Sequence, residues 1–115
     1  MPTVFVIGSD WTLRANVRAE LREAGIEALG METMDEAGQA IARGEWPAAA
    51  VLEAAAGEPN PTALGLLAKR VPVVVVASRT ETVPLPEDAA VVLYRPVRVA
   101  DIVARVKQLL EGQAA

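Results

Sequence analysis

Apolar and polar positions along the chain follow two alternating periodicities. Short apolar runs typical of buried strands are separated by segments in which apolar residues recur every three or four positions, as on one face of a helix. The runs predict strands at residues 3–7, 26–31, 48–52, 71–77 and 89–94. The segments between them predict helices at residues 11–24, 33–43, 60–70 and 99–110. The second strand is half polar, as an edge strand would be.

The regular alternation of strands and helices predicts a single α/β domain over residues 1–115. Four of the five strands are almost continuously apolar, which indicates a parallel sheet covered by helices on both faces. Right-handed crossovers then favour a doubly wound arrangement. Pro84 and Pro86 interrupt the segment between the last two strands and exclude a regular helix interior there.

The composition narrows the possible chemistry. The chain carries 11 basic and 15 acidic residues, a net charge of −4, which provides no broad positive field for nucleic acid or an anionic membrane. It contains neither cysteine nor histidine. This excludes disulfides and the Ser–His–Asp and Cys–His classes of nucleophilic site, and it removes the usual ligands of zinc. No glycine-rich phosphate-binding motif follows the first strand.

Neither a membrane segment nor a secretion signal is evident. No apolar run approaches the roughly 20 residues of a membrane-spanning helix, and the first residues lack the basic region and cleavage site of a signal peptide. We therefore expect a cytoplasmic protein that holds no metal and no other cofactor.

One carboxylate stands where parallel sheets carry their chemistry. Glu53 closes the third apolar run, and in open parallel sheets ligands and reacting groups gather at the carboxyl ends of the strands. From position alone, Glu53 is a reactive group, a metal ligand or the remnant of one.

Several stretches of the chain resemble one known family in the same order. They are the strand at residues 47–53, the Tyr-Arg-Pro-Val stretch at 94–97 with the helix that follows it, and the first helix with Gly25 at its end. Together they resemble response-regulator receiver (CheY-like) domains over the whole chain. The resemblance implies a flavodoxin-like fold with a five-stranded parallel sheet of order 2-1-3-4-5, here with the fourth helix missing or vestigial.

The resemblance also implies a phosphorylation site, from which this chain departs at every position. In the family an acidic pair and a phosphoacceptor Asp hold Mg²⁺, while a hydroxyl residue and a Lys contact the phosphoryl group. The matching positions here are Gly8 and Ser9 (with Asp10 beside them), Glu53, Ala77 and Arg95. We therefore expect a degenerate site, that of a pseudo-receiver, without phosphorylation of the usual kind.

Three interpretations of Glu53 remain open. It pairs with Arg95 through a bidentate carboxylate–guanidinium contact and so mimics a phosphorylated Asp, it is a weak metal ligand, or it is a solvated carboxylate without a partner. The resemblance further predicts a cis bond between Arg95 and Pro96, since the corresponding Lys–Pro bond of the family is usually cis.

The first helix carries candidate interaction residues. Trp11 is either an interface anchor or a cover over the site at the start of the helix. Arg14, Arg18 and Arg22 recur every four positions and form either a surface for an acidic partner or a solvated helix face.

The expected function is a phosphorylation-independent protein–protein interaction or regulatory module in signal transduction. We expect no enzymatic activity, an unidentified protein partner, and a monomer or weak homodimer. The alternatives are a receiver still phosphorylated by a histidine kinase of a two-component system, a small-molecule sensor that uses the vacated pocket, and a structural dimerisation domain.

Overall fold

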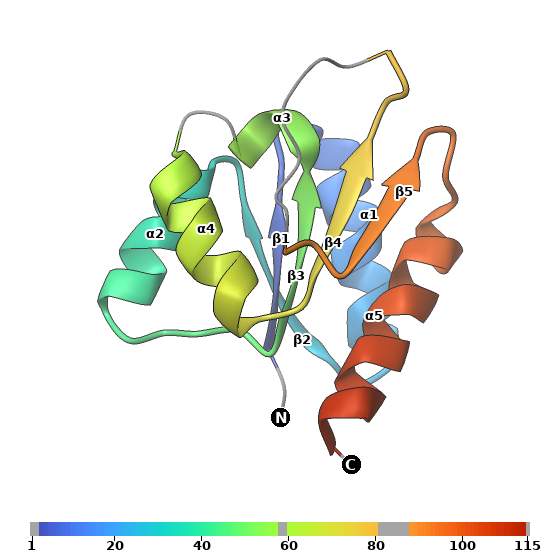
Figure 1. Ribbon diagram of the computed structural model, residues 1–115. Coiled ribbons are helices and arrows are strands. Elements are labelled where there is room, and N and C mark those ends of the chain that lie inside the picture. Colours follow the sequence, from blue (N-terminus) through green and yellow to red (C-terminus); the bar gives the residue numbers. More distant parts are fainter. Residues whose placement is uncertain (1–2, 58–59, 81–87, 115) are drawn as a thin grey trace.

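The computed structural model describes residues 3–57, 60–80 and 88–114, which form a parallel sheet with helices on both faces (Figure 1). The strands are β1 (Thr3–Ile7), β2 (Glu27–Met31), β3 (Ala49–Glu53), β4 (Val73–Ala77) and β5 (Val91–Tyr94). The helices are α1 (Trp11–Glu23), α2 (Met34–Ala42), α3 (Ala54–Gly57), α4 (Pro61–Arg70) and α5 (Val99–Ala114). The strand order β2-β1-β3-β4-β5 confirms the predicted topology.

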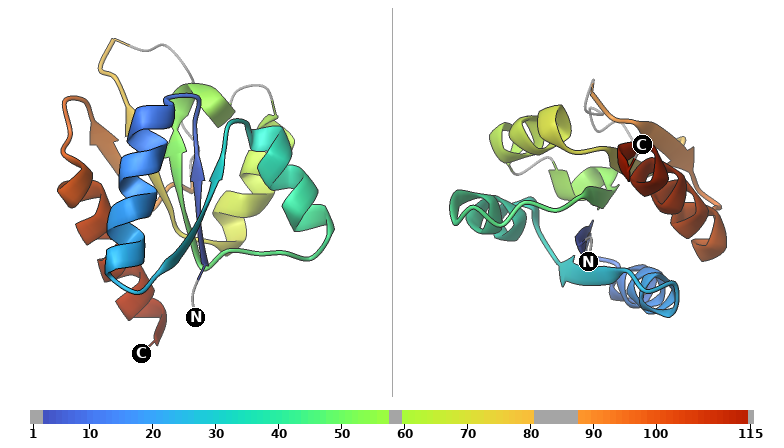
Figure 2. Two further views of the ribbon diagram at one scale, coloured as in Figure 1. Left: turned by 180° about the vertical axis from the view of Figure 1, so that it is seen from behind. Right: turned by 90° about the horizontal axis from the view of Figure 1, so that it is seen from below.

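Two apolar layers hold the fold together, one on each face of the sheet. Successive strand side chains point to opposite faces, so Val4 and Val6 of β1 pack beneath α1 and α5, whereas Phe5 and Ile7 pack beneath α2 and α4. All four side chains are buried. Figure 2 shows these two helix pairs on opposite sides of the sheet. The almost continuous apolar pattern of the strands therefore reflects burial on both faces.

The helix boundaries follow from local signals in the sequence. Asp10, Thr33 and Asn60 cap α1, α2 and α4, and each side-chain oxygen accepts a hydrogen bond from a backbone N–H three residues later. Gly25 and Gly44, with φ of 80° and 82°, end α1 and α2 in a conformation that side chains disfavour. These caps orient the start of each helix at the carboxyl edge of the sheet.

Most predicted boundaries lie within two residues of the observed ones, and two differences are larger. The Ala-rich residues after Glu53, for which neither a helix nor a strand was predicted, form the short helix α3, because alanine has the highest helix propensity. The last helix, predicted over residues 99–110, continues through Gly112 to Ala114. The predicted loss of a fourth helix falls on residues 81–87, outside the described residues, while residues 78–80 and 88–90 beside them are not helical. Within the described ranges no helix is long and apolar enough to cross a membrane.

Candidate functional site

The candidate site lies at the carboxyl ends of β1, β3 and β5. β1 and β3 are paired at the centre of the sheet, and their connections leave in opposite directions, which makes this the position where open α/β sheets commonly bind ligands. Gly8 follows β1, Glu53 ends β3 and Arg95 follows β5. We call these three residues, together with Asp10, the carboxyl-edge site.

Glu53 is held at both carboxylate oxygens. Its Oε2 accepts a hydrogen bond from the backbone N–H of Asp10 at 3.1 Å, and its Oε1 accepts one from Nη2 of Arg95 at 3.0 Å. Only 14% of the side chain is exposed. Of the three interpretations of Glu53, the structure therefore contains the pair with Arg95 and contradicts the solvated carboxylate without a partner.

Arg95 divides its guanidinium between two carboxylates. Nη2 contacts Glu53, and Nη1 lies 3.8 Å from Oδ2 of Asp10. The predicted bidentate contact with Glu53 alone is thus wrong, because Asp10 lies close enough to take the second nitrogen. The backbone N–H of Arg95 donates to the carbonyl of Ala77 at 2.8 Å. The Arg95–Pro96 bond is cis, as the resemblance predicted.

Gly8 provides the space that Glu53 fills. A Cβ added at Gly8 would lie 2.5 Å from Cδ and 2.6 Å from Cγ of Glu53, far inside contact distance. The Glu53 side chain, which is longer than that of the aspartate in the family, therefore crosses the end of β1 and lies over Gly8. The two departures from the family pattern are coupled, since an acidic residue at position 8 would displace Glu53.

Comparisons with known proteins agree with this geometry at the level of the fold. No protein-family model matches the chain, and no curated protein does. Solved structures do match. The receiver domain of Francisella response regulator 1452 aligns with a TM-score of 0.79 at 20% identity, over 98% of this chain and 99% of that one. The fold is that of response-regulator receiver domains.

Two further receiver structures give the same result. A response regulator receiver protein from Burkholderia phymatum aligns with a TM-score of 0.73 at 20% identity, over 96% of both chains. A response regulator receiver modulated diguanylate cyclase from Pelobacter carbinolicus aligns with a TM-score of 0.77 at 18% identity, over 99% of this chain and 96% of that one.

The magnesium site that the receiver resemblance implies does not fit these residues. The Arg95 guanidinium already lies beside both Glu53 and Asp10, so a divalent cation would have to displace this positively charged side chain. Gly8 offers no side-chain ligand. Among the described residues no group of three or more His, Cys, Asp or Glu side chains is placed to hold a metal.

The other positions of the receiver site lie around this pair. Ser9 is exposed, while Ala77 is buried in the core beneath α2 and α4. The hydroxyl of Ser78 lies 2.9 Å from that of Thr80. The cavity beside Glu53, lined by Val6, Leu13 and Val51 among others, encloses only about 10 Å³.

The arginines of α1 occupy different environments. Nη1 of Arg14 donates to the carbonyl of Gly8 at 2.5 Å, and Nε of Arg18 donates to the carbonyl of Ala28 at 3.4 Å. Both side chains pass close over Gly30, where an added Cβ would lie 3.0–3.2 Å from their carbons. Arg22 and Trp11 are exposed, Trp11 at 68%. The three arginines therefore do not share one environment, since Arg14 and Arg18 bind backbone carbonyls after β1 and in β2.

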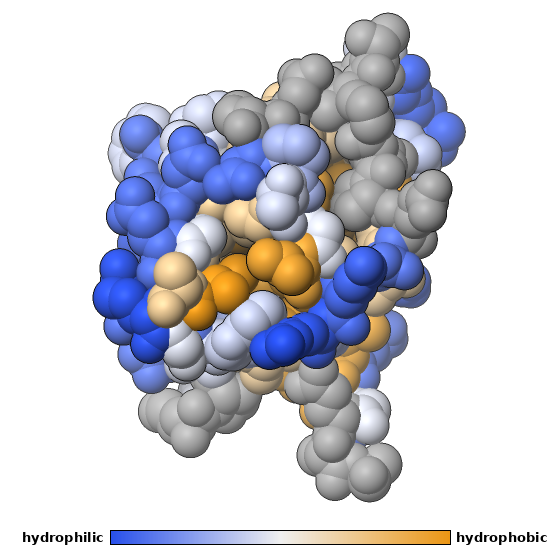
Figure 3. Space-filling view, turned by 60° about the vertical axis from the view of Figure 1, so that its left-hand side comes forward, coloured by the Kyte–Doolittle hydropathy of each residue, from blue (hydrophilic) through white to orange (hydrophobic). Residues whose placement is uncertain are grey.

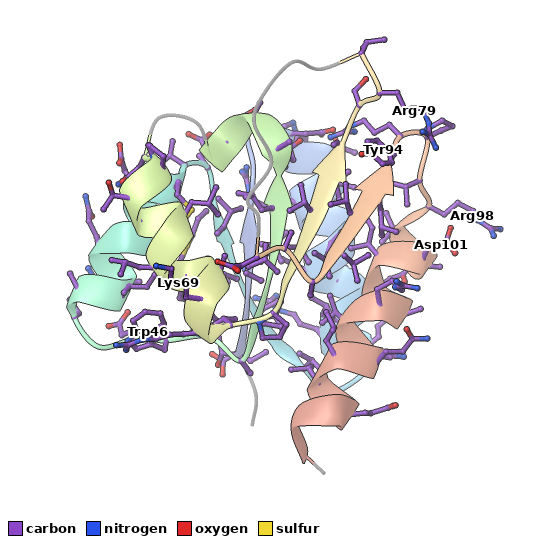
Figure 4. All side chains as sticks on the ribbon, in the orientation of Figure 1. Trp46, Lys69, Arg79, Tyr94, Arg98 and Asp101 are labelled. Carbon is purple, nitrogen blue, oxygen red and sulfur yellow. The ribbon has the colours of Figure 1, made fainter. Side chains whose placement is uncertain are left out.

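One contact near the site was missed by sequence reasoning. The guanidinium of Arg79, which follows β4, stacks 4.6 Å from the ring centre of Tyr94 at the end of β5 (Figure 4). The parallel register that pairs Ala77 with Tyr94 brings the two residues together. No short-range pattern signals such a pair, because it depends on which strands are neighbours.

Proposed function

We propose that this chain is a phosphorylation-independent protein–protein interaction and regulatory module with a receiver fold. It acts in signal transduction without enzymatic activity of its own. The observation that carries the proposal is the Glu53 carboxylate, which lies over Gly8 with one oxygen on the Asp10 N–H and the other on Arg95.

The bonding of the carboxyl-edge site supports this proposal. A phosphoacceptor must present a free carboxylate oxygen to the incoming phosphorus, and in-line transfer tolerates misplacement of about 1 Å poorly. Both oxygens of Glu53 accept hydrogen bonds, and Arg95 supplies the positive charge that a receiver would use for the phosphoryl group. The pair thus occupies the place of the phosphoryl group with groups of the chain itself.

A small-molecule sensor has less support. The space beside Glu53, about 10 Å³, is roughly the room that one water molecule needs. A sensor in this pocket would have to expel the Glu53 side chain before it bound a ligand.

Exposure to a phosphodonor tests the proposal. The protein is incubated with Mg²⁺ and acetyl phosphate, and in parallel with Mg²⁺ and beryllium fluoride. We expect no phosphoryl adduct by mass spectrometry and no change in Trp11 fluorescence, recorded in a Trp46→Phe variant so that one of the two tryptophans reports. A saturable, Mg²⁺-dependent change in either signal would overturn the proposal.

A further inference from the structure

The strongest unexplained feature lies away from the carboxyl-edge site, between α2 and α4. An open groove of about 460 Å³ separates these helices. Its walls include Asp35, Gly38 and Ala42 of α2, the capping residue Asn60, and Ala63 and Leu66 of α4. We call this the α2/α4 groove.

Small residues create the groove. A Cβ added at Gly38 would lie 3.2 Å from Cβ of Ala63, so the two helices approach closely there, and Ala42 leaves the space beyond unfilled. Leu66 projects beside it with 52% of its surface exposed. The space-filling view of this side shows an apolar patch surrounded by hydrophilic residues (Figure 3). An apolar floor with a protruding leucine is the kind of surface into which an amphipathic helix docks.

A carboxylate lies at one end of the groove, and two basic residues lie on α4 beyond its other end. Asp35 lies at the end where both helices begin, bound to Nδ2 of Asn60 at 2.8 Å. Lys69 and Arg70 lie in the last turn of α4. Arg70 stacks 4.7 Å from the ring centre of Trp46, and Figure 4 shows Lys69 near the same end. A partner must therefore offer a cation at one end and a carboxylate at the other.

Helix dipoles select the orientation of such a partner. α2 and α4 each connect parallel strands and so run in the same direction, with their positive N-terminal ends together. A third helix is favoured when it runs the opposite way, with its C-terminus beside Asp35. Helices commonly carry acidic residues in the first turn and basic residues in the last, which matches the groove's charges in this same orientation.

We propose that the α2/α4 groove binds an amphipathic helix of a partner protein, antiparallel to α2 and α4. The helix has carboxylates in its first turn beside Lys69 and Arg70, an apolar face over Leu66, and basic residues in its last turn beside Asp35. About three turns, roughly 16 Å, span the groove. The inference deepens the proposed function and rests on it only for the claim that the chain acts by binding a protein.

Titration with synthetic peptides tests the inference. The first probe is a 14-residue amphipathic helix with Glu in the first turn, Leu on one face and Lys in the last turn, and the second exchanges its charged ends. Amide chemical shifts of isotope-labelled protein report the binding site. We expect saturable shifts confined to α2 and α4 below about 1 mM peptide, with the first probe bound ~3-fold or more tightly than the second.

Matched variants test which residues contribute to peptide binding. Leu66→Glu should weaken the first probe at least ~10-fold, as loss of a central apolar anchor does. Leu29→Glu, which changes an exposed leucine of the edge strand β2, should leave it unchanged. Lys69→Glu should remove the preference between the two probes.

Three results would overturn the inference: no saturable shift up to millimolar peptide, shifts centred outside α2 and α4, or self-association through these helices without peptide. The titration contains neither Mg²⁺ nor phosphodonor, so its failure leaves the phosphodonor result standing. A phosphoryl adduct would likewise leave the peptide result standing.

Discussion

The carboxyl-edge site and the α2/α4 groove differ in what occupies the space beside a glycine. In each, a glycine lets two neighbouring elements come close together. At the carboxyl edge the space over Gly8 is filled by Glu53, whose charge is balanced by Arg95. In the groove the space beside Gly38 and Ala42 stays open to solvent, with Leu66 exposed at its side.

The difference indicates which of the two places can bind another molecule without first breaking contacts within the chain. Hydrogen bonds and charges at the carboxyl edge are satisfied within the chain, so binding there must first break contacts. Apolar surface in the groove has no such internal partner among the described residues, so covering it is favourable by the hydrophobic effect. This receiver fold thus combines a carboxyl edge filled from within the chain with an apolar surface open to solvent.

Replacement of Gly8 and Gly38 by alanine should give the largest difference in the free energy of unfolding. Gly8→Ala places a Cβ against Glu53 and should lower the free energy of unfolding by about 1–3 kcal/mol, as overpacking does. Gly38→Ala should stay within about 0.5 kcal/mol of wild type, because the gain in helix propensity offsets a tight contact with Ala63. Urea denaturation followed by circular dichroism measures both.

A double-mutant cycle separates the clash from other effects of Gly8. In a Glu53→Ala background the added Cβ meets no carboxylate, so Gly8→Ala should cost no more than about 0.5 kcal/mol. Equal losses in both backgrounds would show that the backbone conformation at position 8 requires glycine. They would contradict the coupling between Gly8 and Glu53.

Arg95→Lys should have a smaller effect. A lysine keeps the charge but cannot contact Glu53 and Asp10 with two separate nitrogens of a planar fork. Since the pair is partly exposed, we expect a loss of about 0.5–1 kcal/mol that shrinks in 1 M salt. Arg98→Lys is the matched control, because Arg98 pairs with Asp101 at 86% side-chain exposure and should change stability by less than about 0.3 kcal/mol. Equal losses in the two variants would contradict a special role of the carboxyl-edge pair.

The fold was accessible from the sequence because its signals are local. Apolar runs, the caps at Asp10, Thr33 and Asn60, and the glycines after α1 and α2 each depend on a few neighbouring residues. The errors arose where local signals compete. The last helix was predicted to end at residue 110, but α5 continues through Gly112, where an exposed glycine costs the helix only a modest amount.

The site was only partly accessible, because its contacts join residues far apart in the chain. The resemblance placed Glu53 and Arg95 together, and their separation of 42 positions is bridged by the strand order. It did not reveal that Asp10 would take the second nitrogen of Arg95, or that Glu53 would lie over Gly8. Both depend on side-chain rotamers and on the exact ends of the strands, which carry no periodic signal.

The smallest effect on stability is expected for the Arg43–Glu45 pair, which differs from the carboxyl-edge site in its exposure to solvent. It has the two-point contact that was expected at Glu53, with Nε and Nη2 of Arg43 at 3.3 and 3.2 Å from the two Glu45 oxygens, yet 60% and 57% of its two side chains are exposed. The hydrogen bonds from Arg43, and then its charge, lower the pKa of Glu45.

A depressed pKa in the folded state stabilises the protein above the carboxyl's unfolded value, and this stabilisation is lost as the pH falls through the folded value. Because solvent screens the pair, the free energy of unfolding should scarcely change. An NMR titration of the Glu45 carboxyl should show its pKa rise in Arg43→Gln. An identical pKa in wild type and variant would mean that the contact does not persist in solution. In that case geometry alone, without burial, does not hold an ion pair together in this protein.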